Sequence, residues 1–184
     1  MTEALQNHDS DVDARLLERY RAGDERAATE LVERHAQALA RFAVSLGERE
    51  DVEELVQDTF VRAFAALESF RGESSLRTWL FTIERRLILD RRRASARRNA
   101  RFEDVASELA TEHTALDAVV AEETEGRVQR AIARLSPLQR EVFVLRVAEG
   151  RSYKEIAEIA GTTEGAARVH YHNAMRAVKE FVDA

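Results

Sequence analysis

The chain has 184 residues with one proline, seven glycines and no cysteine, a length that suits one or two compact domains. The lack of cysteine excludes disulfide bonds, thiolate metal sites and a cysteine nucleophile, and the net charge of −6, taken alone, argues against nucleic acid binding. The polar, acidic N-terminus does not fit a signal peptide and no apolar run is long enough to span a membrane, so we expect a cytoplasmic protein without membrane insertion.

Alanine, leucine, arginine and glutamate dominate the composition, which favours helices, and we expect an all-α fold. In the first predicted helix, apolar residues recur at helical spacing between Asp24, which is placed as the N-cap, and Gly47, which is placed to end it. Asp51 and Glu54 resemble the capping box that starts a helix, and the apolar stripe after them reaches Leu67.

A third helix follows the short loop of residues 70–75, in which Ser75 is placed as the N-cap. We assign Trp79 to the core rather than to a stacking platform, because aromatic residues at helical spacing are usually buried. The helix continues past its apolar stripe into the basic run at 90–93, so its far end must project into solvent or onto a partner. We therefore expect three packed helices in the first half of the chain.

Charged residues in the middle of the chain are sharply segregated. Residues 71–101 hold ten arginines and three acidic residues, whereas residues 102–125 hold eight acidic residues and no lysine or arginine. This reversal predicts a basic surface followed by an acidic connector. We expect two helical domains, at residues 1–99 and 125–184, joined by a flexible acidic linker at 100–124.

The helical pattern resumes near Val119 and stops at Ser136, where a further helix begins. Ser136 is placed as its N-cap, Pro137 is the residue favoured at the first helical position, and Gln139 completes a capping box. This helix should run to about Ala148.

A short helix, a glycine turn and a longer helix close the sequence with the spacing of a helix-turn-helix motif. Ser152 and Glu155 form a capping box that opens the short helix. Gly161 supplies the left-handed turn, and Thr163 is placed to cap the last helix. The spacing alone fits an ordinary helical hairpin with a solvated polar face as well, and this alternative stays open.

Three segments of the first half resemble region 2 of the extracytoplasmic-function (ECF) sigma factors of the sigma-70 superfamily: residues 51–64 (DVEELVQDTFVRAF), 70–80 (FRGESSLRTWL) and 90–93 (DRRR). Three segments of the second half resemble region 4 of the same family: residues 135–143 (LSPLQREVF), 152–157 (SYKEIA) and 164–168 (EGAAR). The resemblance implies a region 2 helical bundle, a region 4 helix-turn-helix domain, and an alternative sigma factor. Such a factor binds the RNA polymerase core, recognises the −10 and −35 elements of promoter DNA, and helps to open the DNA.

The resemblance also implies two sets of contact residues in the first half. Polar residues of the second predicted helix would contact the polymerase core, although a solvated helix face is the alternative: Asp51, Glu53, Glu54, Gln57, Asp58 and Arg62. Family members hold a flipped, unpaired −10 base near the 70–75 loop. Six residues are therefore the candidates for the −10 pocket and its phosphate contacts. These are Arg71, Ser74, Arg85, Arg86, Arg91 and Arg92.

For the −35 element, Arg168 is the candidate for a base edge, because a guanidinium can pair with guanine O6 and N7 together. Val169 and Met175 depart from the family pattern, in which small polar and basic residues are frequent along this helix. Val169 is able to touch a thymine methyl instead. The candidate set around Arg168 is Arg151, Lys154, Thr163, Glu164, Val169, His172 and Arg176.

The sequence contains no catalytic constellation, and we expect a protein that is not an enzyme and needs no cofactor. We expect its carboxylates at solvent-facing helix positions. His170 and His172 predict no metal site, because positions two apart on a helix point to different faces.

Two other classes of protein stay open on the sequence alone. One is a helix-turn-helix regulator with a helical sensor or dimerisation domain, and the other is a helical adaptor that binds acidic proteins. The resemblance further implies that an anti-sigma factor is a possible partner.

Overall fold

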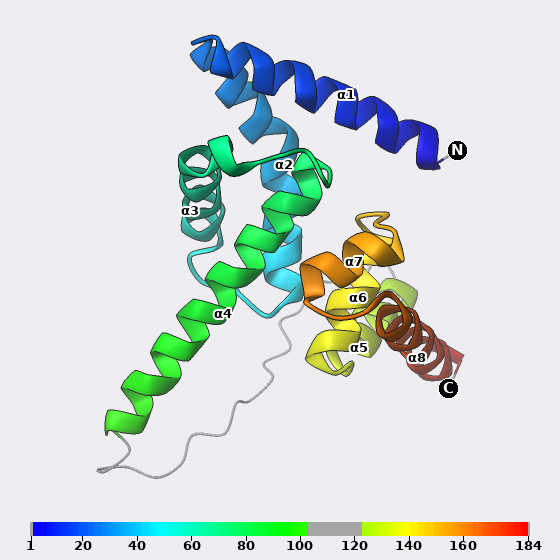
Figure 1. Cartoon of the computed structure of the whole chain (residues 1–184). Helices are drawn as coiled ribbons and strands as arrows, with labels where there is room; N and C mark the ends of the chain where they lie inside the picture. The colour runs from blue at the N-terminus through cyan, green and yellow to red at the C-terminus, as the bar shows by residue number, and fades with distance from the viewer. Residues whose placement is uncertain (1, 103–122, 184) are drawn as a thin grey trace.

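The computed structural model describes residues 2–102 and 123–183, and within these ranges every regular element is helical, as the sequence predicted. Figure 1 shows the arrangement of the elements, with α6 and α7 of the second half lying against the first half. In chain order they are α1 (Thr2–Arg21), α2 (Glu25–Ser45), α3 (Val52–Ala65), the short 3-10 helix η1 (Leu67–Ser69), α4 (Leu76–Phe102), α5 (Glu123–Ala133), α6 (Pro137–Val147), α7 (Tyr153–Ala160) and α8 (Glu164–Asp183). Residues 103–122 of the expected linker, and the expected helix start near Val119, lie outside the described residues.

Local capping signals set most helix starts as predicted. Asp24 Oδ1 accepts a hydrogen bond from the Arg26 N–H at 3.0 Å, and Ser75 Oγ accepts one from the Thr78 N–H at 3.2 Å. Both capping boxes that were expected in the second half are formed, at the starts of α6 and α7. Gly161 adopts the left-handed conformation with φ of 64°, which turns the chain between α7 and α8. These starts need only neighbouring residues, which explains why the sequence was sufficient.

The capping box expected at Asp51 is wrong. Asp51 has a φ of 55°, in the left-handed region, and its side chain makes no cap hydrogen bond. A capping side chain normally requires an extended backbone at this position, so the left-handed turn prevents the interaction. This helix is stabilised instead by the packing of its apolar stripe, in which Leu55 and Phe60 are buried.

The first half contains one helix more than expected, because α1 precedes the three that the sequence indicated. Leu16 and Leu17 are buried among the core residues, and α1 packs along α2. Asp13 is buried as well: its carboxylate lies 2.9 Å from Arg34 Nε and 3.0 Å from His35 Nε2. Burial opposes ionisation of Asp13, but its contacts with His35 and Arg34 outweigh that effect and lower its pKa.

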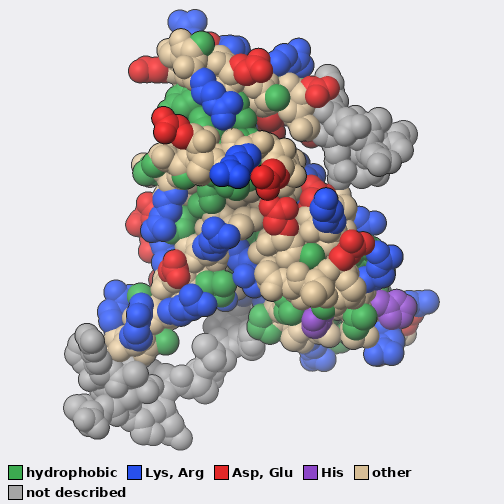
Figure 2. All heavy atoms as spheres, in the orientation of Figure 1, with side chains coloured by type: hydrophobic (Ala, Val, Ile, Leu, Met, Phe, Trp, Pro, Cys, Tyr) green, Lys and Arg blue, Asp and Glu red, His purple; other side chains and the backbone are tan. Residues whose placement is uncertain are grey.

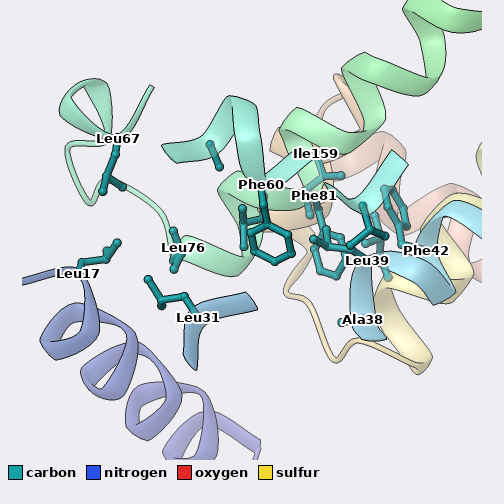
Figure 3. Close-up of a cluster of buried hydrophobic side chains, with 14 of the residues drawn as sticks. Leu17, Leu31, Ala38, Leu39, Phe42, Phe60, Leu67, Leu76, Phe81 and Ile159 are labelled. Atoms are coloured by element: carbon teal, nitrogen blue, oxygen red, sulfur yellow. The ribbon is translucent and has the colours of Figure 1, made fainter. Parts of the chain in front are cut away.

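One hydrophobic core runs through both halves of the chain. Figure 3 shows Ile159 of α7 beside Phe81 of α4 and Leu39 and Phe42 of α2. The rings of Phe42 and Phe81 meet edge to face, with centroids 5.0 Å apart. Val142 and other residues of α6 belong to the same cluster. The helix-turn-helix half is therefore docked on the first half in this structure.

Several carboxylates are buried, which corrects the expectation that they face solvent. Asp13, Glu84, Glu141 and Glu149 are all nearly inaccessible. Glu84 is unusual among them because neither of its oxygens has a hydrogen-bond partner among the residues that the structure describes. Burial raises the pKa of Glu84 to about 9, so the group is protonated at neutral pH.

Glu84 makes the stability of the fold depend on pH. A carboxyl with a raised pKa keeps a proton that the unfolded chain releases. The contribution of Glu84 to the free energy of unfolding is therefore complete below pH 4.5 and is lost as the pH rises through about 9. We expect Glu84→Gln, which cannot titrate, to reduce the slope of unfolding free energy against pH in that window by up to about 1.4 kcal/mol per pH unit. Urea unfolding at several pH values measures the slope.

The matched control is Glu158→Gln, on the exposed face of α7, which should keep the slope of the parent chain. Equal slopes for the parent and for Glu84→Gln would show that Glu84 does not hold its proton in the folded state.

Candidate nucleic-acid interface

The helix-turn-helix motif has the expected geometry. Ile156 of α7 and Ala167 of α8 are fully buried where the two helices cross, and the Thr162 N–H bonds the Ala157 carbonyl oxygen at 3.0 Å across the turn. Thr163 Oγ1 accepts a hydrogen bond from the Ala166 N–H at 3.1 Å and so caps α8. The first turns of α8 consequently pack on α7 through Ala167 and expose their opposite face.

The exposed face of α8 brings most of the −35 candidates together. Glu164, Arg168, Val169, His172 and Arg176 are all exposed along it. Figure 2 shows histidine and basic side chains gathered where α8 lies in Figure 1. A face of this kind, at the start of the second helix of the motif, has the size and polarity to enter a DNA major groove.

Arg168 is fixed on this face by two neighbours. Its Nη2 lies 2.8 Å from Glu164 Oε1, one helical turn earlier. Its Cζ lies 4.8 Å from the centre of the Tyr153 ring, at the start of α7. The guanidinium therefore stacks on an aromatic ring while most of its side chain stays exposed.

Arg151 differs from the other −35 candidates because it is 6% exposed. Its Nε donates to the Glu149 carbonyl oxygen at 2.9 Å, and its Nη1 donates to Glu155 Oε1 at 3.0 Å. In this arrangement the side chain is buried and fixes the turn before α7. Lys154, another candidate of this set, is exposed on α7.

The −10 candidates fall into two groups. Arg71 and Arg86 are exposed, and Ser74 is half-buried in the loop before α4. The other three are in ion pairs within the chain: Arg85 with Glu141 at 2.6 Å, Arg91 with Asp58 at 2.7 Å, and Arg92 with Glu48 at 2.7 Å. Half of the set is therefore engaged by carboxylates in this arrangement.

Trp79 packs against the hydrophobic core, as predicted. It is partly buried, and its ring lies 4.9 Å from the ring of Phe70. The pair anchors the loop of residues 70–75 to the start of α4, so Trp79 has a packing role next to the loop.

The polymerase candidates lie on the side of α3 that faces away from the core. Glu53, Gln57 and Arg62 are exposed on it, with the apolar side chain of Val61 between them at 60% exposure. Asp51 and Glu54 are exposed at the start of the helix, and Asp58 is half-buried. Arg91 of α4 lies 3.6 Å from Glu54 in addition to its contact with Asp58. Arg91 thus connects the −10 candidates with two of the polymerase candidates, Glu54 and Asp58.

The seam between the two halves holds buried polar contacts that the sequence did not predict. The Glu149 side chain is 0% exposed, and its two oxygens accept hydrogen bonds from Arg41 of α2 and Arg77 of α4, each at 3.0 Å. Thr78 Oγ1 donates to Glu155 Oε1 at 2.8 Å. Such partners stand 72 to 108 positions apart in the sequence, so no local signal reveals them.

Beside the apolar core, part of the seam is polar and incompletely packed. Burial raises the pKa of Glu141 even though Arg85 opposes this effect. A cavity of about 320 Å³ lies beside that pair, lined by the end of α2, the middle of α4, the start of α6 and the turn after α7. Interfaces between domains that separate are typically more polar than a permanent core.

In the part of the chain that the structure describes, no helix is both long enough and apolar enough to cross a membrane.

Comparisons with known proteins agree with both halves of the structure. The family Sigma-70 region 2 matches residues 31–98, and the family Sigma-70, region 4 matches residues 125–178. The chain is 32% identical over 165 residues to the ECF RNA polymerase sigma-E factor of Haemophilus influenzae, covering 85% of this chain and 87% of that protein.

Two solved structures are similar to this one. The first is the sigma factor RpoE in complex with the anti-sigma factor NepR from Bartonella quintana, with a TM-score of 0.67 and 30% identity over 85% of this chain and 96% of RpoE. The second is CnrH in complex with the cytosolic domain of CnrY, with a TM-score of 0.63 and 31% identity over 95% of this chain and 97% of CnrH. Both families and these relatives together show that the chain belongs to the extracytoplasmic-function sigma factors of RNA polymerase.

Proposed function

We propose that this sigma factor reads the −10 and −35 promoter elements with two separate surfaces, one in each half of the chain, while the face of α3 holds the polymerase core. The observation that carries the proposal is the exposed face of α8, where Arg168 is presented on a helix that is capped and anchored at its start. Residues 1–99 would form the region 2 domain and residues 125–184 the region 4 domain, with 100–124 as the connector. The factor would act in the cytoplasm, without enzymatic activity of its own.

The direct test is run-off transcription with purified core polymerase and a library of genomic promoters. We expect transcripts that depend on both the chain and the promoter sequence. A helix-turn-helix regulator would bind duplex DNA without the polymerase, but the match to sigma-70 regions 2 and 4 in order does not favour that class. A chain with no affinity for the core polymerase would refute the proposal.

The face of α3 suits a protein partner because charged groups surround an exposed apolar residue. Such groups form charge-assisted hydrogen bonds when they are covered, and Val61 supplies an apolar centre. Because Glu53 and Arg62 are exposed, their substitution should disturb the contact without disturbing the core.

The double substitution Glu53→Arg with Arg62→Glu keeps the net charge but reverses the charge at both ends of this face. We expect the affinity for core polymerase to fall at least about ten-fold, since misplaced charges at an interface cost on the order of several kcal/mol. Fluorescence anisotropy of the labelled chain titrated with core measures the loss. Glu25→Arg, exposed at the start of α2, is the control, and an unchanged affinity of the double variant would exclude this face.

In the first half, the exposed Arg71 and Arg86 flank the loop and helix proposed to bind the −10 element. Arginines near an extruded base hold the backbone while the pocket replaces the stacking that the base has lost. The half-buried Ser74 sits in the loop between them and can hydrogen-bond a base edge.

Arg168 and Lys154 should differ in how their loss affects transcription. Arg168→Ala removes a base contact and should reduce discrimination at one −35 position by about ten-fold, whereas Lys154→Ala should weaken binding about equally on all promoters and reduce the salt dependence. Run-off transcription from promoters randomised in the −35 element, at two salt concentrations, separates the two effects. Identical profiles for the two variants would contradict the assignment.

The docked arrangement holds the two halves of the chain against each other. Elements named −10 and −35 lie about 25 base pairs apart, which is roughly 85 Å along a duplex at 3.4 Å per base pair. The two halves, in contrast, share one core and several ion pairs. We therefore regard the structure as a closed form that must open at the seam when the polymerase binds.

An anti-sigma factor is proposed as a further partner of this closed form. The similar RpoE was solved with the anti-sigma factor NepR, and the likeness to this chain covers 96% of RpoE. A protein that spans the seam would keep the two halves docked, and one that covers α3 would block the face proposed to bind the polymerase.

Glu149 is the residue whose change should open the closed form. Glu149→Arg places a third cation against Arg41 and Arg77 at a buried position, which should disfavour docking by about 3 kcal/mol or more. Because the chain has no cysteine, Glu68→Cys and Glu180→Cys allow specific attachment of a dye pair for energy transfer. We expect a longer and broader distance distribution for the variant.

Glu158→Arg, exposed on α7, is the charge-matched control and should keep the distance of the parent chain. If Glu149→Arg also keeps that distance, the ion pairs at Glu149 do not hold the seam.

A further inference from the structure

The ring of Tyr153 lies at the centre of a small stacked cluster on the helix-turn-helix surface. Arg146 of α6 and Arg168 of α8 each place the guanidinium carbon 4.8 Å from the centre of this ring. Tyr171 of α8 meets the same ring edge on, with centroids 5.9 Å apart, and Phe143 of α6 stacks on Tyr171 at 6.4 Å. The ring of Tyr153 thus connects three helices around the side chain proposed to read a base.

Arg146 holds the ring from the side of α6. Its Nη1 donates to the Arg151 carbonyl oxygen at 2.8 Å, in the turn that precedes α7. Arg151 is itself fixed in the interior by Glu155. The position of Tyr153 is therefore determined by buried structure and does not depend on contact with DNA.

The ring of Tyr153 orients the Arg168 guanidinium and leaves its N–H donors able to bind a base. Stacking occupies the flat face of the guanidinium, whereas the N–H donors lie in its plane and point outward. Glu164 accepts a bond from one of its nitrogens, and the side chain as a whole is 62% exposed. A long side chain that is already ordered loses less conformational freedom when it binds.

We propose that Tyr153 is a positioning residue for −35 recognition, which acts by holding the Arg168 guanidinium in the orientation that a base edge requires. The proposal rests on the proposed role of Arg168 in base recognition. It goes further by assigning part of the sequence discrimination to a residue of α7, the helix that precedes the recognition helix. The ring carries this role, and the hydroxyl group does not.

The test uses the full chain with core polymerase and promoters randomised in the −35 element. Arg168→Ala first identifies the base position that Arg168 reads. We then expect Tyr153→Leu to reduce discrimination at that position by about two- to five-fold, the range of an exposed cation–π contact, and to leave the other positions unchanged. Tyr153→Phe, which keeps the ring, should retain the discrimination of the parent chain. In the Arg168→Ala background, Tyr153→Leu should have no further effect on base preference.

Several results would overturn the proposal. Unchanged base preference in Tyr153→Leu, when Arg168→Ala does change it, would refute the positioning role and leave the proposed function intact. A loss in Tyr153→Phe equal to that in Tyr153→Leu would assign the effect to a hydroxyl contact with DNA. A uniform loss on all promoters, or a further loss of preference in the double variant, would indicate a structural role alone. No change of preference in Arg168→Ala would refute both the proposed base contact and the positioning role.

Tyr153 also packs against Tyr171, so thermal unfolding of each variant accompanies the transcription assay. If Tyr153→Leu does not fold, Tyr153→Met replaces it, because methionine is unbranched and flexible enough to fill the space without a ring. The same expected and contradicting results apply to it.

Discussion

Glu149 is a carboxylate that the fold has removed from water, and the arrangement of the two halves depends on how it is neutralised. Its side chain is inaccessible, and its partners, Arg41 and Arg77, belong to two different helices of the other half. A buried charge costs far more when unpaired than a pair of this kind contributes to stability. The need to pair Glu149 therefore specifies which surface of α2 and α4 the helix-turn-helix half can dock on. The apolar contacts around Phe42 and Phe81 supply the buried apolar surface.

This constraint connects docking with DNA binding. Arg85, Arg91 and Arg92 are neutralised by Glu141, Asp58 and Glu48 in the closed form. Phosphate oxygens can replace carboxylates as partners of arginine with little change in geometry. Of these three pairs, only Arg85–Glu141 joins the two halves, so the proposed opening of the seam would release Arg85 on a protein whose net charge is −6.

The helix-turn-helix half is built differently, because its recognition surface is ordered without any partner. The capping box of α7, the left-handed Gly161, the Thr163 cap of α8 and the stacked side chains around Tyr153 order α7 and α8. The exposed face nevertheless carries few cations, and few phosphate contacts mean weak binding to DNA that has no matching sequence. Under the proposed function, this surface would depend on the polymerase to hold it near the promoter.

The sequence by itself determined the helices that are started by their own neighbours, the helix-turn-helix motif, and the residues on the outer faces of α3 and α8. Each of these depends on hydrogen bonds and spacing within a few positions of the chain. Tertiary structure alone decided the docking of α1, the left-handed start of α3, the interior positions of Glu84 and Arg151, and the closure of the seam. The partners that close the seam through Glu149 lie 72 and 108 positions away, and which charges meet there depends on how whole helices pack.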